Sequence, residues 1–364
     1  MTSETITTTA ARFAKPEVRG ISAYHLDPHT VSIKLNQNEN AAGFPDELKE
    51  DVWERIRSLD WARYPDFHLT EITARLAAHA GVPPEWILVG NGSNEVLQMT
   101  LLTTVGRGDS VVIPVPTFTL YKLQATAMGA AVHPLQLQPD QDFALAASDV
   151  IDLARRHAAK VVVVCSPNNP TGTRYAEDTL REICANVDGL VLLDEAYREF
   201  CDQDLVPLLD EYDNIVLFRT FSKALAMAGL RVGYCVARPD LAREIGKVKL
   251  PYALNIVSEA VTLAALDRPD LFAPTIEMAR SERGRISDAL AALPGVRVYP
   301  SAANFVLARF DAGAAHVFDG LLAHSILVRD VSHYPGLANH LRISVGTPTE
   351  NDALLTALRG LRAN

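Results

Sequence analysis

The chain has 364 residues, a formal net charge of −10, 48% hydrophobic residues and 21% charged residues. This length exceeds the size at which one hydrophobic core stops growing, so we expect two domains, and the composition is that of a globular protein. The negative charge and the lack of a basic run argue against a nucleic-acid-binding protein, and no apolar stretch has the length of a membrane-spanning helix.

Neither the amino-terminal residues nor the cysteines indicate an exported protein. Residues 1–14 are rich in Thr and Ser and lack the apolar core of a signal peptide, so we expect a polar arm and a cytoplasmic location. The four cysteines show no CxxC spacing and no partnered histidines. We therefore expect no disulfide framework and no metal site, with Cys165 and Cys235 as core residues.

A strand is predicted at residues 31–35, and a cluster of amide residues follows it. The cluster reads Asn-Gln-Asn-Glu-Asn over residues 36–40. Amide side chains hydrogen-bond to nearby backbone groups, so such a cluster is typical of a capped turn. A pocket wall is the alternative interpretation.

The next segment contains two predicted helices and a glycine turn. Apolar residues recur at helical spacing over residues 46–59, and residues 68–80 form a second helix. A strand at residues 87–89 then leads into a Gly-Asn-Gly-Ser-Asn-Glu turn that opens a further helix. The first turn of a helix offers unpaired N–H groups and a positive dipole end, so Ser93 and Asn94 are candidates for binding a phosphate.

The middle of the chain alternates predicted strands with helices, which indicates a parallel sheet. The strands are apolar and rich in β-branched residues, as in a sheet that is covered on both faces. They cover residues 109–113, 130–132, 160–165, 190–193, 215–218 and 234–237, and helices lie between them at residues 150–157 and 178–185.

Polar or aromatic residues follow several of these strands, where ligands of open α/β sheets bind. Asn169 lies in a Ser-Pro-Asn-Asn-Pro-Thr-Gly loop that by itself is an ordinary turn. Asp194 closes the next strand, three residues before Tyr197. A buried carboxylate there needs a partner, and a helix N-cap is its alternative role. Phe118 is either a core aromatic or a residue that stacks on a ligand ring.

The most informative stretch follows the strand at residues 215–218. It reads Thr-Phe-Ser-Lys-Ala-Leu-Ala-Met-Ala-Gly-Leu-Arg and contains Thr220, Ser222, Lys223 and Arg231. The two hydroxyls and the arginine suit an anion. Burial beside a cation lowers the pKa of a lysine, and the neutral amine is the form that attacks a carbonyl. A solvated loop lysine is the alternative interpretation.

The remainder predicts a second, smaller unit. We expect a helix at residues 239–248, a long helical stretch from about residue 258 to 293, and then strands alternating with helices. Arg342 lies in an apolar strand and needs an anionic partner. The domain junction is placed within the long helical stretch. The expected division is an N-terminal arm and small-domain segment (1–44), a large domain (45–265) and a small C-terminal domain (266–364).

In their joint order, these motifs resemble the cofactor site of the fold-type I pyridoxal-5′-phosphate (PLP) aminotransferases. The motifs are Gly-Ser-Asn, Asn-Asn-Pro-Thr-Gly, Asp-x-x-Tyr and Ser-Lys…Arg. Within that superfamily the chain is most similar to the class II histidinol-phosphate aminotransferases, nearly from end to end. The resemblance implies an α/β fold with a mixed, mostly parallel seven-stranded sheet flanked by helices, plus a smaller α+β domain. It also implies a PLP cofactor.

The resemblance assigns roles to individual residues. Lys223 is the catalytic residue and is joined to the cofactor aldehyde, and Asp194 meets the ring nitrogen. Phe118 stacks on the ring, while Asn169 and Tyr197 contact its phenolic oxygen. The other cofactor-binding positions are assigned to the phosphate: Ser93, Asn94, Thr220, Ser222, Arg231 and, reaching across a homodimer, Tyr64.

The implied reaction interconverts L-histidinol phosphate and 2-oxoglutarate with imidazole-acetol phosphate and L-glutamate, a step of histidine biosynthesis. Tyr24, Asn169, Arg329 and Arg342 are the implied substrate-binding residues. Asn-Ala-Ala-Gly near residue 41 departs from the commoner Asn-Pro-x-Gly of that family. An aromatic-amino-acid aminotransferase and a phosphorylated-amino-acid decarboxylase of cobalamin synthesis are the alternatives. We expect small-molecule substrates and neither a nucleic acid nor a membrane as partner.

Overall fold

The computed structural model describes residues 12–23 and 28–361. A seven-stranded sheet dominates it, with the strand order β2-β8-β7-β6-β5-β3-β4. Strand β8 runs antiparallel to both of its neighbours, and the other neighbouring strands are parallel. The predicted mixed, mostly parallel sheet is therefore confirmed. Its strands are β2 (Ile87–Gly90), β3 (Ser110–Val115), β4 (Ala131–Gln136), β5 (Val161–Cys165), β6 (Leu190–Asp194), β7 (Ile215–Thr220) and β8 (Gly233–Ala237).

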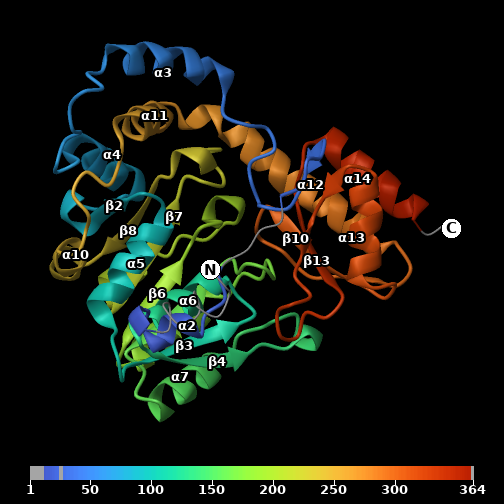
Figure 1. Ribbon diagram of the computed structural model, residues 1–364, viewed down its shortest axis with the longest axis horizontal. Helices are drawn as coiled ribbons and strands as arrows, with labels where there is room; N and C mark the ends of the chain where they lie inside the picture. Colours follow the sequence, from blue (N-terminus) through green and yellow to red (C-terminus); the bar gives the residue numbers. More distant parts are fainter. Residues whose placement is uncertain (1–11, 24–27, 362–364) are drawn as a thin grey trace.

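Helices cover both faces of this sheet, as the apolar strands require. One face packs against α5 (Ser93–Thr104), α6 (Thr119–Met128) and α10 (Pro239–Gly246). The helices of the other face are α3 (Asp46–Ser58), α4 (Thr70–Ala80), α7 (Ala147–Arg156), α8 (Glu177–Asn186) and α11 (Ile256–Asp267). Figure 1 shows α3 and α11 side by side at the edge of the molecule.

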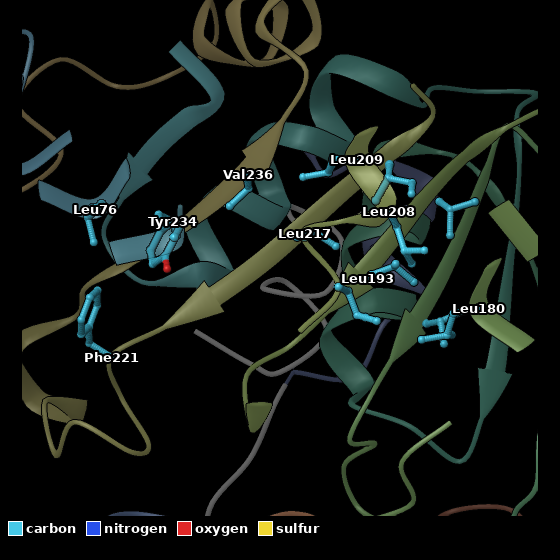
Figure 2. Close-up of a cluster of buried hydrophobic side chains, with 14 of the residues drawn as sticks. Leu76, Leu180, Leu193, Leu208, Leu209, Leu217, Phe221, Tyr234 and Val236 are labelled. Atoms are coloured by element: carbon cyan, nitrogen blue, oxygen red, sulfur yellow. The ribbon is translucent and has the colours of Figure 1, made fainter. Parts of the chain in front are cut away.

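The two cores follow from the alternation of side chains along each strand. In β5, Val162 and Val164 belong to one core, whereas Val161 and Val163 belong to the other. Figure 2 shows part of the first core, which includes Leu193 of β6 and Leu217 of β7. The strands are thus fixed from both sides, and their carboxyl ends hold the polar residues that follow them.

A second, four-stranded antiparallel sheet lies beside the first (Figure 1), in the order β12-β13-β10-β9. The segment before the large sheet returns to this part of the molecule, because β1 (Ile33–Lys34) pairs in parallel with β11 (Ile326–Leu327). The other elements here are β9 (Val296–Val298), β10 (Phe305–Phe310), β12 (Arg329–Asp330), β13 (His340–Ser344), α12 (Ala273–Ala291), α13 (Ala314–Ala323) and α14 (Pro348–Gly360).

The helical stretch predicted from about residue 258 to 293 is helical over most of its length, but it is divided into two helices. Helix α11 ends at Asp267, a 3₁₀ turn follows at Pro269–Leu271, and α12 begins at Ala273. The residue before a proline is disfavoured in the helical region, and Arg268 has φ −131° and ψ 58°. Pro269 therefore ends one helix and lets the chain turn into the next.

Short elements complete the described chain. They are α2 (Pro16–Arg19), α9 (Leu208–Glu211) and 3₁₀ turns at Pro84–Trp86, Pro139–Gln141, Arg198–Phe200 and Ala228–Leu230. All four cysteines are free, and Cys165 and Cys235 are buried as predicted. Across residues 12–23 and 28–361, none of the helices has the length and apolar character needed to cross a membrane.

The two sheets draw on separate parts of the chain. The large sheet uses residues 87–237, and the four-stranded sheet uses residues 296–344. On this distribution we propose a large domain over residues 45–265 and a small domain that combines residues 266–364 with the segment before residue 45.

Candidate active site

A cavity of about 390 Å³ opens at the carboxyl ends of β5, β6 and β7. Its walls come from both sheets, because Asp194 and Lys223 lie on one side and Arg342 of β13 on the other. The segment from Asn36 to Glu39, which follows β1, also lines it. The pocket interpretation of the amide cluster is therefore confirmed.

Lys223 lies in the loop after β7 with its amine inside this cavity. Burial, and next to it the Arg342 guanidinium, lowers the pKa of Lys223 to about 8. Its Nζ donates a hydrogen bond to the backbone carbonyl of Gln37 at 2.9 Å. The site thus holds a lysine that is close to neutral and therefore nucleophilic near pH 8.

Asp194, the last residue of β6, is a carboxylate held by two donors. The Tyr121 hydroxyl donates to Oδ2 at 2.6 Å, and the Ala196 N–H donates to Oδ1 at 2.9 Å. Burial raises the pKa of Asp194, while these two hydrogen bonds act to lower it. The two donors thus fix the orientation of a buried carboxylate that lines the cavity.

Hydrogen-bond donors surround one end of the cavity. The Arg231 Nη1 donates to Ser222 Oγ at 3.2 Å, and Ser222 Oγ lies 3.0 Å from Thr220 Oγ1. Helix α5 begins beside them with Ser93, so its first N–H groups have no helical acceptor. Gly92 has φ +83°, and a Cβ there would lie 2.5 Å from Arg231 Nη2. Only glycine fits, and the resulting pocket suits a phosphate.

Arg342 links the two sheets across the cavity. Its Nη1 donates to Asn169 Oδ1 at 2.6 Å, and its Nη2 donates to the Asn36 carbonyl at 2.5 Å. Because the guanidinium occupies Oδ1, the amide Nδ2 of Asn169 is the group left to donate into the cavity.

Most of the predicted site residues lie together. Those that line the cavity are Ser93, Asn94, Phe118, Asn169, Asp194, Tyr197, Thr220, Ser222, Lys223, Arg231 and Arg342. Arg329 lines a neighbouring cavity of about 680 Å³, which shares Asn36 with the first. Tyr64 lies outside both, with 79% of its surface exposed. Tyr24 falls outside the described residues.

A family model, aminotransferase class I and II, matches residues 30–358. The chain belongs to this family. It is 38% identical to the histidinol-phosphate aminotransferase of Chlorobaculum tepidum over 348 residues, which cover 95% of this chain and 99% of that protein.

Two solved structures share the fold of this aminotransferase. The histidinol-phosphate aminotransferase of Sinorhizobium meliloti, in complex with pyridoxal-5′-phosphate, has a TM-score of 0.87 and 24% identity over 97% of this chain and 98% of that one. An L-threonine-O-3-phosphate decarboxylase of Porphyromonas gingivalis has a TM-score of 0.78 and 23% identity over 91% of this chain and 100% of that one. At these identities the likeness shows the fold alone.

The cavity of this aminotransferase fits PLP, the cofactor on which the class I and II family depends. Its lining supplies hydrogen-bond donors for a phosphate, the Asp194 carboxylate, the Lys223 amine and the Phe118 ring. A phosphate, a basic ring nitrogen and an aldehyde are the groups that these residue types bind.

Two contacts of this aminotransferase were not predicted from the sequence. One is the hydrogen bond that the Tyr121 hydroxyl donates to Asp194 Oδ2. Asn38 was placed in a possible pocket wall, but not on the Tyr197 hydroxyl, to which its Nδ2 donates at 3.0 Å. For Tyr121, the one local indication of a place near the site is its position three residues after Phe118. Asn38 and Tyr197 are 159 residues apart, so no local spacing connects them.

Proposed function

We propose that the chain is a histidinol-phosphate aminotransferase, which moves an amino group between L-histidinol phosphate and 2-oxoglutarate. The products are imidazole-acetol phosphate and L-glutamate, and the reaction belongs to histidine biosynthesis. The observation that carries the proposal is the Lys223 amine, with its lowered pKa, in one cavity with Asp194 and a cluster of phosphate donors. The near-full-length similarity to relatives of that name supports the substrate.

In this proposal, different cavity residues bind different groups of the cofactor. Asp194 faces the ring nitrogen, Phe118 stacks on the ring, and Asn169 and Tyr197 donate to the phenolic oxygen. The phosphate is bound by the donors Ser93, Asn94, Thr220, Ser222 and Arg231. When bound, PLP supplies an aldehyde that takes up amines and a ring that accepts the electron pair released at the substrate Cα.

Lys223 moves the proton in the chemical step. As a neutral amine it would take the proton from the substrate Cα, and as the ammonium it would pass that proton to the cofactor carbon C4′ within the same half-reaction. The second half-reaction would run the two transfers in reverse. The Lys223 pKa of about 8 suits both roles, because either form is accessible near neutral pH. The Gln37 carbonyl, 2.9 Å from Nζ, holds the amine within the cavity.

In the same proposal, arginines of the small sheet bind the anionic groups of the substrates. Arg342 is placed to exchange its present acceptors for a carboxylate, which an arginine binds through two parallel hydrogen bonds. Arg329 lies in the neighbouring cavity together with Lys122. A longer substrate with a terminal phosphate would extend there, and Tyr24 is proposed as a further contact.

The proposal includes a homodimer in which Tyr64 serves the partner's cofactor. Tyr64 stacks on Tyr252 with ring centroids 4.3 Å apart, and Phe67 packs on Tyr252 at 5.7 Å. Tyr64, Phe67 and Leu250 are 79%, 56% and 67% exposed. Exposed apolar residues gathered in this way favour an interface with another chain. A cytoplasmic location and the lack of nucleic-acid and membrane partners stay predictions.

A substrate panel tests the function. The purified protein is loaded with PLP, and formation of imidazole-acetol phosphate from histidinol phosphate and of the keto acid from phenylalanine is measured, with 2-oxoglutarate as acceptor. We expect kcat/KM to favour histidinol phosphate. A preference for phenylalanine, or release of CO₂ from a phosphorylated amino acid, would overturn the proposal.

A further inference from the structure

Asn38 occupies a place that its backbone makes unusual. It has φ +56°, in the left-handed region that few residue types tolerate, and only 1% of its surface is exposed. The small sheet holds it on two sides. Asn304 Nδ2, just before β10, donates to the Asn38 carbonyl at 3.0 Å, and Ser344 at the end of β13 contacts both its backbone and its side chain.

The contacts with Ser344 fix which way the Asn38 amide points. The Asn38 N–H donates to Ser344 Oγ at 2.8 Å, and Ser344 Oγ lies 2.8 Å from Asn38 Oδ1. Among the described residues, Asn38 Oδ1 is the acceptor that the structure gives to the Ser344 hydroxyl. The opposite amide orientation would leave that buried hydroxyl proton without an acceptor, which is costly. Oδ1 therefore faces Ser344, and Nδ2 faces away from it.

Asn38 Nδ2 then sets the direction of the Tyr197 hydroxyl. It donates to the Tyr197 oxygen at 3.0 Å. Burial raises the pKa of Tyr197, so the hydroxyl keeps its proton. A hydroxyl whose oxygen accepts from one side has its own proton to donate elsewhere. Tyr197 lines the cavity, so the proton is available to a ligand there.

We propose that Asn38 is a positioning residue that makes Tyr197 donate into the cavity. In this chain of hydrogen bonds, the Ser344 hydroxyl donates to Asn38, Asn38 donates to Tyr197, and Tyr197 donates to an oxyanion of the ligand. The inference rests on the proposed function, in which that oxyanion is the phenolic oxygen of PLP. Asn38 and Ser344 adjoin the small sheet and Tyr197 follows β6, so the donor is correctly directed only when the two sheets are docked.

A measurable consequence follows for the bound cofactor. A hydrogen bond donated to the phenolic oxygen stabilises its negative charge, and the oxygen then holds a shared proton less tightly. If the donor turns away, the proton is held to higher pH. The visible absorbance of the PLP-loaded protein changes with this proton, so its midpoint in a pH titration reports the Tyr197 bond.

The test compares variants of the full chain loaded with PLP. Asn38→Gly keeps the left-handed backbone without strain and removes the amide. Tyr197→Phe removes the hydroxyl, and the double variant removes both. We expect the absorbance midpoint to rise by about one to two pH units in each single variant. We expect no further rise when Asn38→Gly is added to Tyr197→Phe, since Asn38 acts through that hydroxyl.

Two further variants keep the test decisive. Ser344→Ala retains Asn38 but frees its amide to rotate, and we expect a smaller rise in the same direction. Asn351→Ala is the matched control, because Asn351 is fully buried and its Nδ2 donates to Glu282 at 2.7 Å, away from the cavity residues. It should lower stability and leave the midpoint unchanged.

The outcomes separate this inference from the proposed function. A parent protein that does not develop visible absorbance with PLP overturns the function itself. A parent that does so, with an unchanged midpoint in Asn38→Gly and Ser344→Ala, overturns only the role of Asn38. Additive shifts in the double variant overturn it as well, because they show that Asn38 acts on the cofactor without Tyr197.

Discussion

Lys223 is reactive because of where its amine lies. An exposed lysine titrates near 10.5, whereas burial and the Arg342 charge bring the pKa of Lys223 to about 8. The amine is protonated and unreactive below that pH, and it is neutral above it. The same environment that makes the lysine nucleophilic thus sets the pH above which its amine is neutral, about 8.

The rate of PLP uptake by the cofactor-free protein should follow this titration. We expect the rate to rise about tenfold per pH unit below pH 8 and to level off above it. Stopped-flow absorbance between pH 6 and pH 10 measures it, and Lys223→Ala, which should give no visible absorbance, is the control. A rate that keeps rising to pH 10 would mean that the amine is not buried.

Tyr121 should keep Asp194 ionised. Tyr121→Phe preserves the ring and removes the hydroxyl that donates to Oδ2 at 2.6 Å, so the pKa of Asp194 moves further up. A protonated carboxyl no longer stabilises a cationic ring nitrogen, so PLP binding is lost as the pH falls through that pKa. We expect roughly tenfold weaker binding in the variant and a loss that begins at higher pH. Equal affinities for parent and variant from pH 5 to 8 would show that Tyr121 only packs.

At the scale of elements, the site depends on the ends of β6 and β7 staying together. The residues next to Asp194 and Thr220 point to the opposite face, where Arg219 Nε donates to Glu195 Oε2 at 2.8 Å. Arg219 Nη2 also donates to Asp204 Oδ1 at 2.7 Å. Arg219 and Glu195 are 2% and 1% exposed, so this ion pair is fully desolvated. It joins two strands whose last residues line the cavity.

Replacing Arg219 alone should lower the free energy of unfolding far more than replacing Arg219 and Glu195 together. Arg219→Met leaves Glu195 buried without its counter-ion, and we expect a loss of about 3–5 kcal/mol in the free energy of unfolding. Arg219→Met with Glu195→Leu should recover much of it. Arg309→Met, which breaks an exposed pair with Asp311, should cost under about 1 kcal/mol. Urea unfolding of the cofactor-free protein measures these free energies. Similar losses of unfolding free energy in Arg219→Met and Arg309→Met would contradict the prediction.

Local sequence predicted the elements best where the chain is most regular. The apolar runs of β5, β6 and β7 marked the strands, and the polar residues directly after them became the cavity lining. The break at Pro269 was missed because apolar residues continue on both sides of it. The bonds of Asn38 to Tyr197 and of Arg342 to Asn169 were not predictable, because each joins segments that meet only when the sheets dock.

At the scale of the whole molecule, the cavity exists because two sheets share it. Arg342 from the small sheet reaches Asn169 beyond β5, and the segment after β1 places Gln37 over Lys223. Neither half holds all the donors and acceptors alone. The exposed stack of Tyr64 on Tyr252 extends this dependence to a second copy of the chain in our proposal.

Mixed dimers give a direct test of that dependence. Subunits carrying Lys223→Ala and subunits carrying Tyr64→Phe are given different affinity tags, mixed under dissociating conditions and purified as heterodimers. In the heterodimer, the subunit with an intact Lys223 faces a partner with an intact Tyr64. If Tyr64 serves the neighbouring site, PLP binds there with parental affinity, whereas the Tyr64→Phe homodimer binds about 10- to 100-fold more weakly because a charged hydrogen bond is lost. If the heterodimer binds PLP as weakly as the Tyr64→Phe homodimer, Tyr64 acts within its own subunit and the shared site is wrong.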